Sequence, residues 1–473
     1  MQKNMLGALG GVSDDTMQQI QNQVKDQLQL QKAITTSQGL VGYNLEAPAK
    51  QLVPMMSPMR NRIPRKVSKT GVAANWKVIT DIRNGRPTTT EGARGNLVDY
   101  STENKSADFK ILSLGDNVSF EAQAGGRDFQ DVRAMAGTNL LLKLMMNEEI
   151  YDIGGNITAI NNPTNVTASA GGTGGTIPTN TYNVYVAALT IPGMNTATML
   201  DSQINNLFID NTYGVTMAVA GTPVGVTLGQ KLTIGCTRVH GAYAYAMFAG
   251  TGTAATLQVI SSTNSFTLDK VVAGGLSYDA ITTNSTADAL AYDGILPQIL
   301  AGNGFVLDGN NAKLTALNGG VAELDELNAY AWGRYKIGYT RYICGAGMQE
   351  SITSAIMGST AAPLLFTNKE EVNQIRGNQL VTQYVNRAMG GKVIEIEAHP
   401  YLPNSCLIAL PEVIPYPNNE VTSLLEKECG YDYMQFDYAM TLPRYEFEVR
   451  MWGALKNYFP AACGVLVNFA KGV

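Results

Sequence analysis

Two places in the sequence carry residue types that could do chemistry. Residues 345 to 350, Gly-Ala-Gly-Met-Gln-Glu, follow an expected strand and open an expected helix, as a G-x-G-x-x-G dinucleotide fingerprint would. Glu350 replaces the third glycine and would place a carboxylate near the pyrophosphate, so a plain strand-to-helix turn is the better interpretation. His399 and Cys406 are seven residues apart, which permits a thiolate pair. Nothing else there supports a nucleophile, and we expect both residues in the core.

The remaining candidate groups favour structure over catalysis. Glu148 and Glu149 are consecutive near the end of a predicted helix, so they point about 100° apart, and we expect a solvated or interface patch instead of a catalytic dyad. The chain has two histidines and lacks G-x-S-x-G, H-E-x-x-H and G-K-[ST] motifs. We therefore predict that it is not an enzyme, with no catalytic residue, no metal and no cofactor. The five cysteines are scattered without a C-x-x-C pair and are expected to be reduced, buried thiols: Cys236, Cys344, Cys406, Cys429 and Cys463.

Basic residues dominate between positions 60 and 94. Two predicted strands, residues 75–82 and 109–120, bracket this region, and the polar segment between them forms a tip. The pattern predicts a long two-stranded loop that is stable only when something packs on it. A charged interface is favoured over nucleic-acid binding, because the strands lack regularly interleaved aromatic residues. The expected inter-subunit contacts are Arg62, Arg65, Lys66, Lys69, Trp76, Arg83, Arg86 and Arg94.

A long helix over residues 127–152 organises the chain around it. Its apolar residues recur at spacings of three, four or seven, Asp128 is placed to act as the N-cap, and the glycines at 154 and 155 end it. Before it we predict a polar helix over residues 13–36 and an extended arm over residues 39–60, neither stable without another surface.

The segments after the long helix differ in composition. Residues 156–279 carry few charges, and their short strand signals predict an all-β sandwich with patterns that resemble immunoglobulin-like or fibronectin-type modules. The predicted strands are residues 181–189, 214–220, 231–239, 242–250, 256–260 and 265–269. From about residue 290 the pattern is mixed α/β. It predicts helices at residues 320–335 and 348–357, and strands at residues 339–344 and 392–398.

Length and charge limit the function classes. A chain of 473 residues is expected to form two to four structural units. With 34 basic and 39 acidic residues the net charge is −5, which argues against general binding to nucleic-acid phosphates. We expect neither a secretion signal nor a membrane span, since Lys143 interrupts the longest apolar run.

Taken in this order, the chain resembles a major capsid protein of a tailed bacteriophage with the HK97-type fold. The local phrases that carry the resemblance are AYDGILPQI (291–299), HPYLPNSCLIAL (399–410) and WGALKNYFPAACGVL (452–466). The resemblance implies an α+β fold with an inserted all-β sandwich. The implied parts are an N-terminal arm (1–59), an extended loop (60–120), the spine helix of the peripheral domain (121–155), an Ig-like insertion domain (156–287), the peripheral domain (288–338), the axial domain (339–440) and a return to the peripheral domain (441–473).

The resemblance also implies a function. Hexamers and pentamers of the chain would form an icosahedral head shell around packaged double-stranded DNA, assembled in the host cytoplasm and found in the virion. Scaffolding, portal and decoration proteins would be partners, DNA would be enclosed without sequence-specific contacts, and no membrane would be involved. Some members link a loop lysine to an asparagine of a neighbour. Lys66, Lys69 or Lys77 with Asn457 would be the candidates, although nothing in the sequence brings them together. The alternative is a surface or adhesion protein with a carbohydrate-binding Ig-like module.

Overall fold

The structure is a computed structural model of a mixed α/β protein. It describes residues 18–19, 21–23, 55–68, 71–85, 87–127, 129–196, 198–199, 207–210, 212–317, 319–358, 380–417 and 419–471. The chain forms two compact units, residues 1–52 with 124–131, and residues 53–123 with 132–473. In the first unit residues 18–19 and 21–23 are helical, within the predicted helix at 13–36, and the rest of that prediction lies outside the described residues. The second unit carries the remaining elements, except for residues 124–126 of a short helix that belong to the first unit.

The long predicted helix is present as α4 (Val132–Gly154). It begins at Val132 and not at Arg127, because a turn at 127 and 129 separates it from the short helix α3 (Phe120–Gly126). The predicted start was wrong because Phe129 continues the apolar spacing of the helix although its backbone is not helical. Asp128, the expected N-cap, lies outside the described residues.

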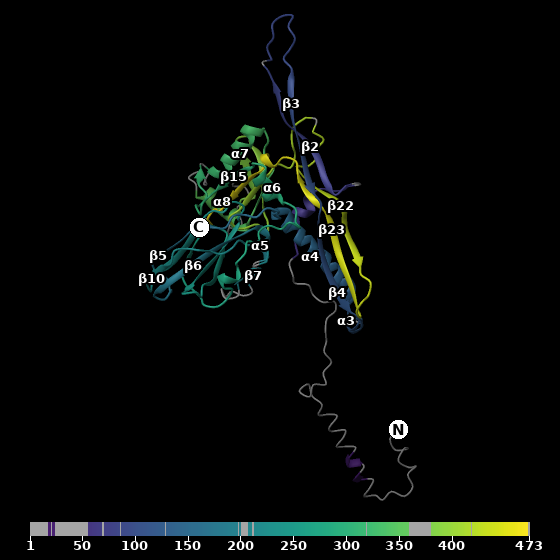
Figure 1. The fold of residues 1–473 in the computed structure, drawn as a ribbon, viewed down its shortest axis with the longest axis vertical. Coiled ribbons are helices and arrows are strands. Elements are labelled where there is room, and N and C mark those ends of the chain that lie inside the picture. The colour runs from purple at the N-terminus through teal and green to yellow at the C-terminus, as the bar shows by residue number, and fades with distance from the viewer. Residues whose placement is uncertain are drawn as a thin grey trace, which may run out of the picture. The chain divides into compact units, whose positions relative to one another are not determined.

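One side of α4 packs on a four-stranded sheet (Figure 1). The strand order is β1 (Arg65–Val67), β22 (Leu425–Asp437), β23 (Arg444–Asn457), β4 (Lys110–Ser119). The β1–β22 pair is parallel, and the other two pairs are antiparallel. Leu140 and Leu144 of the helix are buried against Val118, Phe447 and Val449 of the sheet. Each such side chain stabilises the contact by roughly 1.5–3 kcal/mol through removal of apolar surface from water.

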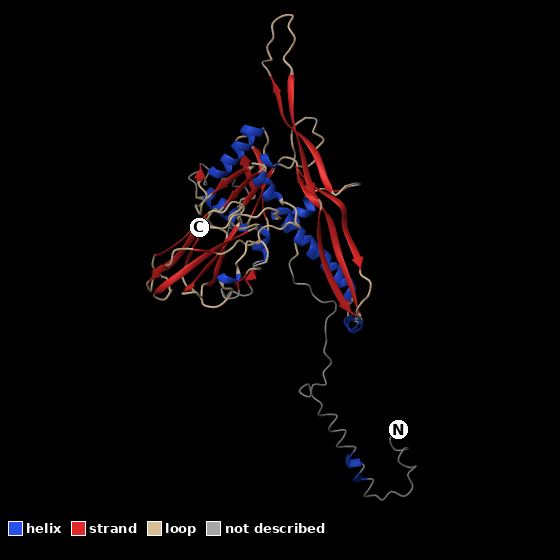
Figure 2. Ribbon diagram, viewed as in Figure 1, coloured by secondary structure: helices blue, strands red, loops and turns tan. Residues whose placement is uncertain are grey.

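A separate two-stranded sheet, which we call the β2–β3 ribbon, precedes β4 in the chain. It consists of β2 (Ala73–Asn84) and β3 (Val98–Asp108), which pair only with each other in the part of the chain that the structure describes (Figure 2). The predicted loop was therefore correct for its first strand and wrong for its second. The predicted strand at 109–120 is β4, whose partner is β23. Strand β3 escaped prediction because its sequence, VDYSTENKSAD, is exposed along most of its length and shows no apolar alternation.

A six-stranded mixed sheet forms the α/β part. The strand order is β15 (Phe305–Asp308), β24 (Gly464–Val467), β21 (Leu407–Leu410), β18 (Arg341–Cys344), β20 (Lys392–Ala398), β19 (Gln383–Asn386). Helices α7 (Ala322–Tyr335) and α8 (Ala346–Met357) share one core with this sheet, through Leu324, Ile352 and Tyr342 among others. The predicted helices and strands of this region are present. The sheet combines strands from three of the predicted segments, 288–338, 339–440 and 441–473.

Two antiparallel sheets follow α4 in the chain. One contains β10 (Val224–Val226), β6 (Asn180–Leu189), β12 (Ala244–Thr251) and β13 (Thr256–Ser261), with β9 (Val219–Ala220) beside β6; the other contains β14 (Ser265–Leu268), β11 (Lys231–Thr237) and β5 (Thr164–Gly171). Val184 and Met247 from the first sheet share an apolar core with Leu232 and Ile234 from the second. The strand predictions were correct for β6, β11, β12, β13 and β14. The strand predicted at 214–220 is present only as the two-residue β9, and β5 and β10 were not predicted.

Shorter elements connect these parts. They are α2 (Pro58–Arg62), α5 (Ile191–Thr196), β7 (Thr198–Met199), β8 (Leu207–Phe208), the 3-10 helix η4 (Tyr278–Ala280), α6 (Ile295–Ala301), β16 (Ala316–Leu317), β17 (Gly320–Val321) and the 3-10 helix η5 (Pro460–Ala462). Helix α2 lies at the end of the predicted arm, which was expected to be extended. Among the described helices, none has the length and apolar character that crossing a membrane requires.

The end of α4 requires glycine because other segments approach its backbone closely. A Cβ atom on Gly155 would lie 2.5 Å from the Tyr292 carbonyl oxygen. Gly155→Ala is therefore expected to lower the free energy of unfolding by about 1–3 kcal/mol, as overpacking does, measured by urea denaturation. Gly333→Ala is the control, because nothing lies within 4 Å of a Cβ at this position in α7. It should be neutral or stabilise by up to about 1 kcal/mol, and equal effects of the two changes would contradict this account.

Candidate functional site

The last two turns of α4 carry three acidic side chains that are completely buried. Glu148, Glu149 and Asp152 each expose 1% or less of their surface. Glu148 and Asp152 are four residues apart and share one face of the helix, which is directed at β1 and β22, while Glu149 is directed at α2. The expected solvated or interface patch at 148 and 149 was therefore wrong. We call the buried charged groups around these three residues the ion cluster.

Glu148 lies at the centre of the ion cluster. Its Oε1 atom is 2.7 Å from Arg65 Nη1 and 3.3 Å from Lys427 Nζ, and its Oε2 atom is 3.6 Å from Arg60 Nε. The Tyr433 hydroxyl donates a hydrogen bond to the same carboxylate. Burial alone would raise the pKa of Glu148, but the Lys427 and Arg65 cations outweigh it and lower that pKa to about 2. The group is thus ionised and joins α4 to β1 and β22.

Asp152 and Lys427 form a completely buried pair of the cluster. Lys427 Nζ lies 2.5 Å from Asp152 Oδ1, and the Tyr292 hydroxyl donates to the same oxygen at 2.7 Å. The other oxygen, Oδ2, is buried and has no hydrogen-bond partner. Burial raises the pKa of Asp152, to about 6, against the opposing effect of Lys427. An acid and an amine are therefore held in contact, with one carboxylate oxygen left without a donor.

Glu149 ties a third region of the chain to the cluster. It accepts hydrogen bonds from the backbone N–H groups of Met59, at 2.7 Å, and Arg60, in the first turn of α2. His399 Nε2 lies 2.6 Å from Glu149 Oε1, while His399 Nδ1 accepts from the Tyr401 N–H at 3.2 Å. Negative charge at the amide end of a helix is stabilising, which accounts for the short helix α2 at this place.

The remaining sequence candidates have structural explanations. His399 is bonded to Glu149 and Tyr401, and burial raises the pKa of Cys406, so no thiolate pair forms between them. The glycine turn connects β18 and α8 as predicted. A Cβ on Gly345 would lie 2.2 Å from the Pro403 carbonyl oxygen, so the chain itself occupies the space beside the turn. Within the described residues, no group of three or more His, Cys, Asp or Glu side chains is arranged to hold a metal ion.

The eight predicted contact residues differ in how far their own chain engages them. Arg65 lies in the ion cluster, and Trp76 packs edge-on against Tyr458 at 6.0 Å. Arg62 pairs with Glu397 at 2.8 Å on the surface. Lys66, Arg83 and Arg94 are exposed, and Lys69 and Arg86 lie outside the described residues. Asn457, the conceivable crosslink acceptor, is buried.

Sequence reasoning missed the cation of the cluster although β22 carries a signal for it. Leu425, Lys427 and Cys429 alternate along the strand, and all three are buried on the same face. A lysine at an apolar position of this alternation predicts a buried charge, and a buried charge requires a partner.

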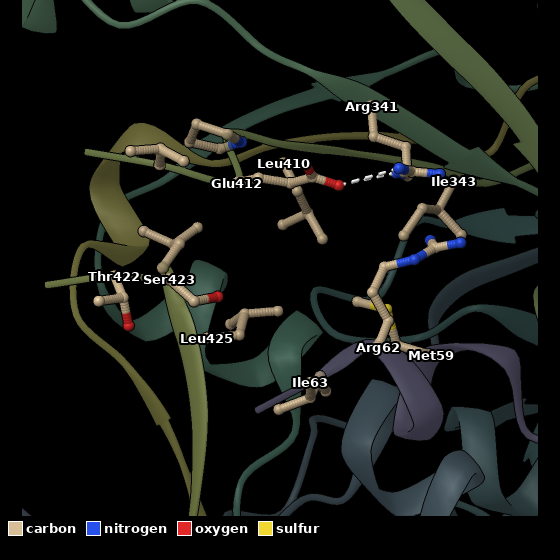
Figure 3. A pocket seen from close by; sticks show the side chains of 13 residues that line it. Met59, Arg62, Ile63, Arg341, Ile343, Leu410, Glu412, Thr422, Ser423 and Leu425 are labelled. Carbon is tan, nitrogen blue, oxygen red and sulfur yellow. Dashed lines mark hydrogen bonds and ion pairs between the residues drawn. The ribbon is translucent and has the colours of Figure 1, made fainter. Parts of the chain in front are cut away.

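A pocket of about 300 Å³ lies beside the cluster, between α2, the six-stranded sheet and residues 422–425 (Figure 3). Its lining is largely apolar, with Met59, Ile63 and Leu410 on three sides. The two arginines at its edge are ion-paired: Arg62 with Glu397 and Arg341 with Glu412, the latter at 3.0 Å. The pocket therefore shows no group poised for chemistry.

The cluster predicts a particular response to acid. Because the folded pKa of Glu148 lies below the ordinary 4.5, this carboxylate stabilises the fold above pH 4.5 and loses that contribution as the pH falls through 2. The shift corresponds to about 3 kcal/mol. Arg65→Met removes one of the cations that lower the pKa of Glu148. As the pH is lowered, the melting temperature of this variant should therefore begin to fall at a higher pH than that of the wild type. Arg94→Met, at an exposed position in the segment between β2 and β3, should leave this pH dependence unchanged; the same pH dependence for both variants would contradict the assignment.

Comparisons with known proteins give structural neighbours only. No protein-family model and no curated protein matches the chain. Among solved structures, it is similar to the capsid of a native GTA particle, with 8% identity, a TM-score of 0.42, and coverage of 91% of this chain and 96% of that one. The capsid of Myoviridae phage XM1 gives 8% identity, a TM-score of 0.41, and coverage of 92% and 99%. A structure of Microbacterium phage Oxtober96 gives 8% identity, a TM-score of 0.43, and coverage of 91% and 96%.

Proposed function

We propose that this chain is the major capsid protein of a tailed bacteriophage with the HK97-type fold. In this proposal hexamers and pentamers of the chain form an icosahedral head shell around packaged double-stranded DNA. The observation that carries the proposal is the β2–β3 ribbon, whose apolar side chains are left exposed in the single subunit.

Among the described residues, the ribbon packs on the body at its base. There Ala74 and Phe109 are buried with Ala454 of β23. Farther along, Ile82 and Tyr100 face each other across the two strands and are 59% and 60% exposed, and Leu97 at the tip is 92% exposed. An isolated two-stranded ribbon is at best marginally stable in water. Burial against a neighbouring subunit would stabilise it, so assembly would complete the fold.

The order of elements supports the same proposal. Residues 1–59 would be the arm, residues 60–120 the extended loop that contains the ribbon, and α4 the spine helix. The two antiparallel sheets within residues 156–287 would be an Ig-like insertion domain. The six-stranded sheet would lie mainly in the axial domain. The four-stranded sheet beside α4 would combine β1 and β4 of the extended loop with β22 of the axial domain and β23 of the return to the peripheral domain.

The ion cluster has a structural part in this proposal. It joins the start of the extended loop (Arg60 and Arg65) to α4 and to β22, using buried ion pairs. A loop that packs on a neighbouring subunit must be anchored at its base, and these ion pairs supply the anchor.

The chain would reside in the virion. Scaffolding, portal and decoration proteins would be partners, and DNA would be enclosed without sequence-specific contacts.

Sedimentation velocity tests the proposal on the purified chain. A capsid protein is expected to sediment as discrete species much larger than a monomer, with rings and closed shells favoured as protein concentration increases. A single monomeric species at all concentrations, with glycan binding by the intact chain, would favour the adhesion alternative instead.

A further inference from the structure

The pair at the centre of the ion cluster has the arrangement that amide formation needs. Lys427 supplies an amine, Asp152 a carboxyl group and Glu148 a second carboxylate, and all three are 1% exposed or less. Lys427 Nζ lies 2.5 Å from Asp152 Oδ1 and 3.3 Å from Glu148 Oε1. We propose that Lys427 and Asp152 condense within each subunit to an amide bond, with Glu148 as the carrier of the proton.

The condensation requires the neutral forms of both partners. Transfer of one proton from the Lys427 ammonium to the Asp152 carboxylate leaves a neutral amine and a neutral acid, which a water-free interior tolerates better than two charges. Burial raises the pKa of Asp152, to about 6, so a larger fraction of this carboxyl group is protonated near neutral pH than at an ordinary aspartate. Glu148 stays ionised because Arg65 also contacts it, so a base remains beside the amine.

The bond changes balance. Lys427 Nζ attacks Asp152 Cγ, and the C–N bond forms as the amine loses a proton to Glu148. Glu148 returns that proton to the departing oxygen, the C–O bond breaks, and one water leaves. The products are a secondary amide, water and the regenerated Glu148 carboxylate. No oxidant or other reactant is consumed.

The surroundings of Asp152 distinguish its two oxygens. Lys427 Nζ and the Tyr292 hydroxyl both contact Oδ1, so Oδ1 takes the proton that Lys427 gives up. A second proton, returned by Glu148, converts Oδ1 into the departing water. Oδ2 is buried and receives no hydrogen bond, and it becomes the carbonyl oxygen of the amide.

A second buried lysine provides a comparison within the same chain. Lys456 Nζ lies 2.8 Å from Glu428 and 3.3 Å from Glu426, but these carboxylates are 15% and 18% exposed. With water near its acid partners, the Lys456 pair is expected to remain an ion pair. Condensation is thus predicted for one lysine and not for every buried one.

Mass spectrometry of the denatured, full-length chain tests the proposal without any variant. The expected result is a mass lower than that of the sequence by one water, with fragmentation showing a branched peptide that joins Lys427 to Asp152. A chain with the full mass, or a water loss located elsewhere, would overturn the proposal. This measurement does not depend on shell formation, so its failure leaves the proposed function untouched.

Two variants test the assigned roles. Glu148→Gln keeps the shape of the side chain but removes the base, and Lys427→Arg keeps a cation but removes the amine. Both are expected to be folded, by circular dichroism, and to have the full mass. Complete amide formation in Glu148→Gln would remove Glu148 from the mechanism. Should a variant fail to fold, the wild-type mass still decides the main proposal.

Discussion

Replacing Ile82 with lysine and Tyr100 with glutamate is expected to abolish shell formation while the subunit remains folded. The two side chains are cross-strand neighbours on the β2–β3 ribbon, and both are exposed in the single subunit. An opposite-charge pair preserves cross-strand attraction, so the ribbon itself should persist. Each large apolar side chain buried at a subunit contact contributes roughly 1.5–3 kcal/mol, and the loss recurs at every contact of the shell. Sedimentation velocity measures whether the double variant forms shells, and thermal unfolding measures whether its subunit remains folded.

Leu228→Lys serves as the control for the ribbon variant. Leu228 is 72% exposed in the turn between β10 and β11, outside the ribbon, so its replacement removes a similar apolar surface from a different place. It should assemble as the wild type does. Normal assembly of the Ile82→Lys, Tyr100→Glu variant would show that the exposed ribbon face is not a subunit contact.

Lys427→Met is expected to have the largest effect on the stability of the subunit. Methionine fills much of the space of the lysine stem, but Asp152 and Glu148 lose the ammonium that contacts them both. Removing one partner of a buried ion pair destabilises a protein by roughly 3–5 kcal/mol. Urea denaturation should show this loss at neutral pH. A chain that carries the Asp152–Lys427 amide would lose more, because the bond closes a loop of 275 residues.

Two comparisons isolate the electrostatic part of that loss. Lowering the pH should reduce the difference between Lys427→Met and the wild type, because protonation neutralises the carboxylates that have lost their cation. Lys456→Met should cost less, since its carboxylate partners are partly exposed. An effect of Lys427→Met below about 1 kcal/mol, with no pH dependence, would mean that the ion cluster does not stabilise the fold.

Periodicity predicted the elements whose two faces differ in burial. Helix α4 and the strands β6 and β20 were predicted from their apolar spacing, because each packs one face on a core. Strand β3 was missed for the converse reason. Most of its residues are exposed in the subunit, so no alternation marks it. As a result, the second strand of the extended loop was assigned to β4, which pairs with β23 instead.

The ion cluster was missed because adjacent glutamates ordinarily lie at the surface. Glu148 and Glu149 can be buried because Arg65, Lys427 and His399 pair with them. These three partners lie 83 to 279 residues away along the chain. No local pattern encodes these partners. The alternation of Leu425, Lys427 and Cys429 indicated a buried cation, but not which carboxylate would meet it.

Negative-stain electron microscopy of the purified protein tests the central claim most directly. The chain should be expressed alone and together with candidate scaffolding proteins, and the fractions should be separated by size before imaging. The proposed function predicts closed shells, or rings of five and six subunits, in at least one of these preparations. Uniform monomers in every preparation, under all conditions of salt and protein concentration, would contradict it.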